Sequence, residues 1–328
     1  MQPEVLKHLF DDGLVDEAGY NAMTTFEKNK PVKLYWDLHT LLYTGILLLT
    51  TGAGIFVYEN IDAIGHITVV TLIGICCAAC LGWCLKTGGG FSYNKVSSPN
   101  IWFDYVLLLG CLLLLTFAGY LQYRFNVFGN RWGLALFIPT VILFTTAYYF
   151  DNLAVLGLAI TNLAAWAGIT IAPLQILQSN NFGSERIIYA GTILGAVLML
   201  AAMLTKERNI KKHFAFTYKN FGVHLLLISC IAGMFLFKSM YLLWFLMLLL
   251  PCLYIFYTAL SDASLYFVVV SVLYAWVGVS YIMTDSLGGI SVKLEGIYLI
   301  LVYYIASGFG VVRILMYYNK KLKKDDSI

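Results

Sequence analysis

Ten long runs of apolar residues constrain this chain more than any other feature. Each run has 17 to 21 residues and at most one Asp or Arg; the runs lie at 38–58, 66–85, 101–120, 133–150, 153–171, 187–204, 221–237, 240–260, 265–283 and 297–316. A helix needs about 20 apolar residues to cross a bilayer. The sequence therefore predicts an all-α fold, a polytopic transmembrane helical bundle of about ten helices over residues 35–318. Its shortest connections are Asp151–Asn152 and Lys238–Ser239.

Composition excludes several other classes of protein. Hydrophobic residues make up 60% of the chain and charged residues 12%, whereas soluble domains are about half apolar and a quarter charged. This argues against a soluble enzyme, a disordered chain and a membrane β-barrel, whose strands alternate over about 10 residues. The net charge of +3 is too small to indicate nucleic-acid binding. All seven cysteines lie in apolar runs, so they do not form a disulfide framework.

Two short segments flank the bundle. Residues 1–34 read as a cytoplasmic hairpin of two amphipathic helices, in which Gly13 ends the first helix and Asp16 caps the second. The segment is mixed in charge, unlike a signal peptide, so we expect it to stay on the mature protein. Two small helices bury little surface alone, so we expect the hairpin to dock on the bundle, the membrane surface or a partner. Residues 319–328 form a charged cytoplasmic tail.

The distribution of basic residues predicts the orientation. If the N-terminus is cytoplasmic, 16 of the 21 Lys and Arg residues lie on the cytoplasmic side and five lie outside. Cytoplasmic loops of membrane proteins carry an excess of Lys and Arg. Both termini are therefore predicted to be cytoplasmic, which requires an even number of spans.

The first and third runs resemble each other at an offset of 65 residues. The matching positions are Gly45/Gly110, Leu47/Leu112, Leu48/Leu113, Leu49/Leu114, Thr51/Thr116, Ala53/Ala118, Gly54/Gly119 and Tyr58/Tyr123. One interpretation is a parallel repeat of helical hairpins, with spans one and two equivalent to spans three and four. Gly45, Gly54, Gly110 and Gly119 would then sit at close helix contacts. The alternative is coincidence between two leucine-rich helices.

Motifs in the first half of the chain resemble a known family. Between the two short helices lie Gly13, Leu14, Asp16 and Glu17, and a Gly-rich first run leads to Asn60. The later motif residues are Ala118-Gly119, Gln122, Asn126, Pro139 and Trp166. Over residues 1–170 the chain resembles the bacterial membrane proteins grouped as domain of unknown function 2157. The resemblance implies a multi-pass protein of a bacterial inner membrane and carries over no activity.

Ionisable residues lie only near the ends of the ten runs. Three runs that would begin on the cytoplasmic side carry ionisable residues at their starts: Asp37 and His39 at the first run, Asp104 at the third and His224 at the seventh. We predict that these four side chains form a candidate polar cluster at the inner mouth of the bundle; the alternative is ordinary interfacial polarity. No ionisable side chain is expected at mid-bilayer, which argues against ion-coupled transport and buried acid–base catalysis. Asn162 is expected to hydrogen-bond a neighbouring helix.

Cysteine and lysine patterns leave further alternatives. Cys76, Cys80 and Cys84 share one helix face and could bind a soft metal or carry redox chemistry. Small-residue helix packing is the favoured interpretation, so no metal and no cofactor are predicted. The basic clusters at 206–212 and 320–324 indicate topology and can also hold anionic lipid headgroups.

Three classes of function remain. The favoured class is a non-enzymatic scaffold or complex subunit that binds a membrane or cytoplasmic protein through its N-terminal hairpin. The second is a carrier or binder of a lipid or small apolar molecule, and a membrane enzyme ranks last. A cavity between helices would favour the second class. Membrane lipids are the expected partners, and the sequence does not indicate a particular ligand.

Overall fold

The computed structural model describes residues 15–17, 19–21, 24, 35–59, 65–171, 185–288 and 294–325, and this part of the chain contains helices but no strand. It divides into two units, Met1–Asn60 and Ile61–Ile328, which are described separately. In the first unit, Gly19 N donates a hydrogen bond of 3.0 Å to Asp16 Oδ1, as at a helix N-cap. Its long helix is α3 (Tyr35–Glu59), which includes the apolar stretch Thr40–Phe56.

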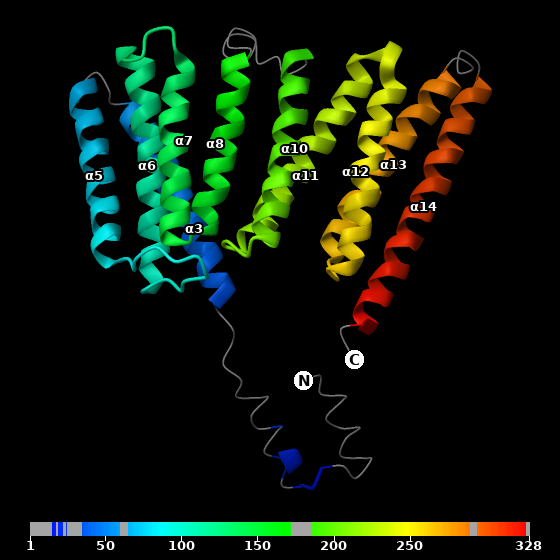
Figure 1. The fold of residues 1–328 in the computed structure, drawn as a ribbon, viewed down its shortest axis with the longest axis horizontal. Helices are drawn as coiled ribbons and strands as arrows, with labels where there is room; N and C mark the ends of the chain where they lie inside the picture. Colours follow the sequence, from blue (N-terminus) through cyan, green and yellow to red (C-terminus); the bar gives the residue numbers. More distant parts are fainter. Residues whose placement is uncertain are drawn as a thin grey trace. The chain divides into compact units, whose positions relative to one another are not determined.

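The second unit is a row of helices that run alternately up and down (Figure 1). They are α5 (His66–Thr87), α6 (Ile101–Phe125), α7 (Trp132–Phe150), α8 (Leu153–Ile171), α10 (Glu185–Glu207), α11 (Phe214–Leu236), the 3₁₀ turn η1 (Lys238–Met240), α12 (Tyr241–Ser261), α13 (Leu265–Gly288) and α14 (Leu294–Asp325). Within the described ranges, nine helices are long and apolar enough to cross a membrane. This confirms the predicted polytopic helical fold, in which α3 is a tenth, shorter apolar helix.

Both of the shortest predicted connections separate two helices. Asp151 ends α7 in the left-handed conformation, with φ of 59°, and the Asn152 side chain accepts a 3.0 Å hydrogen bond from Val155 N at the start of α8. Asn and Asp tolerate these positions because their short side chains bond the local backbone. The α11–α12 connection is a single turn at Lys238–Met240.

Helix α11 begins seven residues before the apolar run that predicted it. Its first turns bury Phe214 and Tyr218 (0% and 5% exposed), so aromatic packing extends the helix through a segment that reads as polar. His224 is consequently the eleventh of 23 residues, about 15 Å from the start of the helix. The expectation that every ionisable residue lies near a helix end is therefore wrong for His224.

Glycines allow α10 and α11 to pack backbone to backbone. A Cβ atom added at Gly195 would lie 2.5 Å from Leu226 N, and one at Gly222 would lie 2.9 Å from Met199 N. Small residues permit such close approach between membrane helices. The pair takes part in both buried clusters of the unit, one shared with α5–α8 and the other shared with α12–α14.

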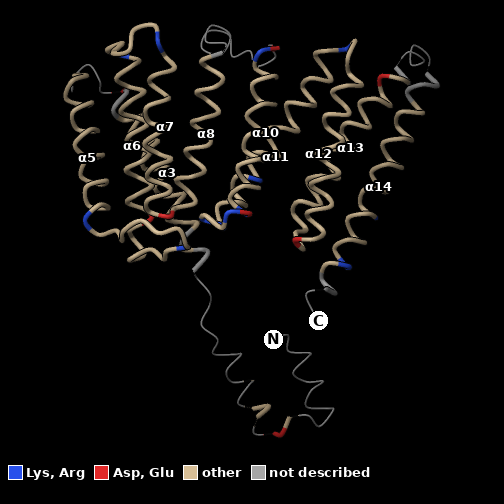
Figure 2. The backbone as a smooth tube through the Cα atoms, in the orientation of Figure 1, with Lys and Arg blue, Asp and Glu red and all other residues tan. Residues whose placement is uncertain are grey.

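The α5–α6, α7–α8, α10–α11 and α12–α13 connections lie at one end of the second unit, at the bottom of Figure 2. We call this end the lysine-rich end. Its described basic residues include Lys86, Lys95, Lys206, Arg208, Lys211, Lys212 and Lys219, whereas the opposite connections hold Arg124, Arg131, Arg186 and Lys238.

Candidate functional site

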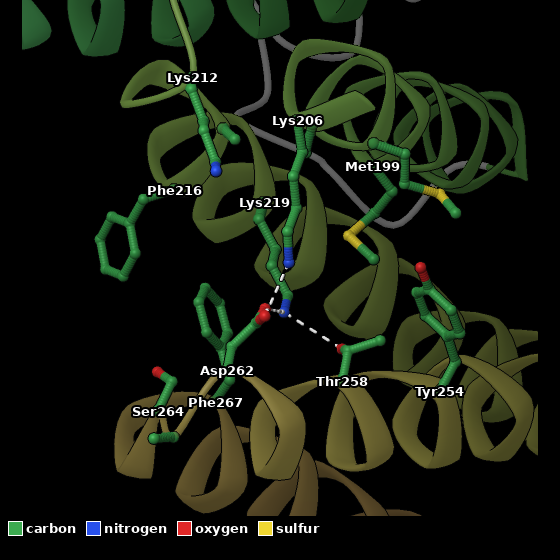
Figure 3. Close-up of a pocket in the computed structure, with 14 residues that line it drawn as sticks. Met199, Lys206, Lys212, Phe216, Lys219, Tyr254, Thr258, Asp262, Ser264 and Phe267 are labelled. Carbon is green, nitrogen blue, oxygen red and sulfur yellow. Dashed lines mark hydrogen bonds and ion pairs between the residues drawn. The ribbon is translucent and has the colours of Figure 1, made fainter. Parts of the chain in front are cut away.

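A cavity of about 510 Å³ lies between the ends of α10, α11, α12 and α13 at the lysine-rich end (Figure 3). We call it the basic pocket. Most of its wall is apolar or aromatic, from residues that include Met199, Met203, Phe216, Tyr254 and Phe267. Its charged lining residues are Lys206, Lys212, Lys219 and Asp262.

Asp262 pairs with two of the three lysines. Lys206 Nζ lies 2.7 Å from Asp262 Oδ1, and Lys219 Nζ lies 3.8 Å from Oδ2. Lys219 also donates a 3.2 Å hydrogen bond to Thr258 Oγ1, and its ammonium lies 4.4 Å from the centre of the Phe267 ring. Figure 3 shows the Lys206, Lys212 and Lys219 side chains pointing toward the side that carries Asp262 and Thr258.

Two of these four charged residues, Lys206 and Asp262, lie at helix ends. Lys206 lies in the last turn of α10, where the helix dipole favours a cation. Asp262 follows α12, and its N–H bonds the Thr258 carbonyl at 2.9 Å. Lys219 starts inside α11, and its long stem lets the ammonium reach the pocket, leaving its side chain 16% exposed. The pocket thus combines a cationic end with an apolar wall, which suits an amphipathic anion.

A second, more open cavity adjoins the basic pocket. It holds about 530 Å³ and is lined by Tyr93, Asn94, Lys95, Asn209, Lys212 and His213. Lys212 lines both cavities. Position 212 therefore sits on the wall between them.

A buried ion pair anchors the α10–α11 loop beside these cavities. Lys211 is fully buried, and its Nζ lies 3.0 Å from Asp151 Oδ1. Within the described residues the Lys211 ammonium makes no hydrogen bond, because its geometry toward Asp151 is unfavourable. The electrostatic attraction between the two charges does not depend on hydrogen-bond geometry. His213 Nε2 also contacts Asp151 Oδ1 at 2.6 Å, and Val96 N donates to Oδ2 at 2.6 Å. One carboxylate therefore joins three connections at the lysine-rich end.

The predicted polar cluster is only partly described. The side chains of Asp37 and His39 lie outside the described residues. Asp104 accepts hydrogen bonds from Ser98 Oγ at 2.7 Å and from Asn152 Nδ2 at 2.9 Å. His224 bonds tyrosines of α13 instead, so the structure does not bring Asp104 and His224 together. Any cluster with Asp37 and His39 stays a prediction.

His224 forms a polar bridge between α11 and α13. Tyr266 donates its hydroxyl hydrogen to Asn220 Oδ1 at 2.6 Å, so it accepts from His224 Nε2 at 2.9 Å. Neutral imidazole then accepts at Nδ1 from the Tyr274 hydroxyl, also at 2.9 Å. This tautomer is assigned from the hydrogen-bond network. The bridge ties the two helices together within the membrane span.

The predicted helix-packing residues differ in their surroundings. Asn162 Nδ2 donates to the Leu136 carbonyl at 2.9 Å and to Thr140 Oγ1 at 2.8 Å, joining α8 to α7. A Cβ at Gly110 would lie 3.1 Å from Cys80 Cβ, a close helix contact. Among the described residues no atom lies within 4 Å of a Cβ built at Gly119, and α3 belongs to the other unit, so the packing role of Gly119 stays a prediction.

The other two glycines, Gly45 and Gly54, lie on α3 in the first unit. Their packing against other helices stays a prediction. The same holds for the internal hairpin repeat, because its first copy includes α3.

Only part of the cysteine stripe of α5 is packed: Cys84 is buried, Cys80 lies beside Gly110 of α6, and Cys76 is exposed. The neighbouring Cys77 Sγ contacts the Gly110 carbonyl at 3.4 Å, and Cys111 of α6 is 1% exposed. Small side chains at such positions allow helices to approach. Among the described residues no group of three or more His, Cys, Asp or Glu side chains could hold a metal ion.

Fold and composition together define a polytopic α-helical membrane protein. Residues 7–156 match the family model described as "Predicted membrane protein (DUF2157)", which confirms the resemblance noted from the sequence motifs. No curated protein and no solved structure matches the chain. The match includes Asp151 but ends before Lys206, so the basic pocket lies outside the matched segment.

Proposed function

We propose that this protein is a non-enzymatic membrane protein that binds an anionic lipid in the basic pocket. The observation that carries the proposal is the placement of Lys206, Lys212 and Lys219 at one end of an apolar cavity between helices. Basic pockets between transmembrane helices at the cytoplasmic surface suit anionic headgroups. An acyl chain would lie along Met199, Met203 and Tyr254.

The proposed orientation places the lysine-rich end and both termini in the cytoplasm of a bacterial inner membrane. With this orientation, 16 of 21 Lys and Arg residues lie inside, as the positive-inside rule expects. The pocket then opens at the leaflet where anionic lipids give a negative surface potential.

A carrier or binder now ranks above the scaffold that the sequence favoured. The scaffold proposal depends on the hairpin at residues 1–34, most of which lie outside the described residues. The pocket, in contrast, offers a defined volume and defined charges. A partner protein at the hairpin stays a proposal of second rank.

Lipid retention tests the binding function. We expect Lys206→Gln with Lys219→Gln to lower retention of anionic lipid about 30-fold in native mass spectrometry of the purified protein, since each lysine near the surface contributes about 1 kcal/mol. The matched control is Lys320→Gln with Lys321→Gln, which removes two exposed lysines at the end of α14. Equal retention by both double variants would contradict the proposal.

A further inference from the structure

We propose that the basic pocket selects a phosphate monoester headgroup, which carries close to two negative charges, over a phosphodiester headgroup, which carries one. This inference rests on the proposed binding of an anionic lipid. It goes further because it names the chemical class of the headgroup.

The charge balance of the pocket carries the inference. Three ammonium groups and one carboxylate line the cavity, so the lining has a net charge of +2. A phosphate monoester carries about −1.5 to −2 at pH 7. Lys219, whose side chain is only 16% exposed, gains most from an added anion, because a charge held partly out of water is stabilised by a partner. A monoester neutralises this lining, whereas a phosphodiester leaves about one positive charge unmatched.

The hydrogen-bond geometry leaves donors for such a headgroup. An ammonium group has three N–H donors. Lys206 directs one toward Asp262, and Lys219 is engaged by Thr258 and, at 3.8 Å, by Asp262. Both lysines therefore retain donors, and Lys212 adds a third ammonium from the loop side (Figure 3). The three terminal oxygens of a monoester give each of the three lysines its own acceptor, whereas two lysines would have to share one of the two terminal oxygens of a diester.

The charge of Lys212 should determine which of the two headgroups the pocket prefers. Asp262 already balances one of the charges of Lys206 and Lys219, so these three side chains together carry +1. That charge suits a phosphodiester. Lys212 raises the total to +2 and should supply the preference for a monoester.

The experiment compares two lipids and one soluble headgroup. Purified protein is reconstituted in phosphatidylcholine nanodiscs that contain either phosphatidic acid, a monoester, or phosphatidylglycerol, a diester. Retained lipid is measured at pH 8 and pH 5. We expect about fivefold preference for phosphatidic acid at pH 8, since one added ion pair contributes about 1 kcal/mol. The preference should vanish at pH 5, because the second phosphate ionisation has a pKa near 6.

Two variants make the test specific. Lys212→Gln should abolish the preference while phosphatidylglycerol is still retained, and Lys212→Arg should restore the preference. The matched control, Lys95→Gln, removes a lysine that lines the second cavity but not the basic pocket, and the preference should survive. The melting temperature of each variant verifies that it is folded.

Each remaining outcome has a defined meaning. Equal, lysine-dependent retention of both lipids overturns the headgroup selection but supports the proposed lipid binding. If lipid retention does not depend on Lys206 and Lys219, both the headgroup selection and the proposed lipid binding in the basic pocket are overturned. If an equal concentration of glycerol 3-phosphate displaces phosphatidic acid, the proposal that the monoester belongs to a lipid is overturned, and the ligand is a soluble phosphate monoester.

Discussion

At the scale of single residues, the ion pair of Asp151 and Lys211 differs from that of Asp262 and Lys206. The first pair is 1% and 0% exposed, whereas Asp262 and Lys206 are 38% and 54% exposed. Water screens an exposed pair, so such a pair adds little to stability. Removing one partner of a buried pair leaves an uncompensated charge.

We therefore expect Asp151→Asn to lower the unfolding free energy by about 3–5 kcal/mol. Asp262→Asn is the matched control, with an expected change below about 1 kcal/mol. Unfolding in mixed micelles with increasing denaturing detergent measures both. Adding Lys211→Met to Asp151→Asn should recover much of the loss; a double variant no more stable than Asp151→Asn would contradict this account.

At the scale of helices, glycine positions separate close packing from open faces. Gly195 of α10 meets the backbone of α11, where neither partner can move away. Gly119 of α6 has no described atom within 4 Å of the place where a Cβ would lie. The sequence repeat drew attention to Gly119 and gave no sign of Gly195, because one helix sequence does not reveal which face meets a neighbour.

We expect Gly195→Leu to lower the melting temperature strongly or to prevent folding, because its side chain would overlap the Leu226 backbone. Gly119→Leu should leave the melting temperature nearly unchanged in the same detergent. Gly195→Ala provides a folded intermediate case, with a smaller decrease. If Gly119→Leu is the more damaging variant, α6 has a partner at this face.

At the scale of the whole molecule, the alternation of spans fixes which connections share one side of the membrane. The α10–α11 loop holds Arg208 and is predicted to face the cytoplasm, whereas the α6–α7 loop holds Arg131 and lies at the opposite end. Under the proposed function, this arrangement also decides which leaflet would supply the lipid.

Cysteine labelling in intact cells checks this orientation. In a background without the seven native cysteines, Arg208→Cys should resist an impermeant thiol reagent until the cells are permeabilised. Arg131→Cys should react in intact cells. The reverse pattern would invert the orientation and place the basic pocket at the outer leaflet.

The sequence by itself determined the helical membrane fold, because each span must satisfy its own backbone hydrogen bonds in lipid and so needs a long apolar run. It also marked the lysines at 206–212 as possible headgroup ligands. Only the tertiary structure decided that Lys219, inside α11, and Asp262, after α12, meet Lys206 around one cavity. It likewise placed His224 at mid-helix and separated it from Asp104. These pairings join residues about 40 to 60 positions apart, and they depend on which helix faces pack together, which hydropathy alone does not specify.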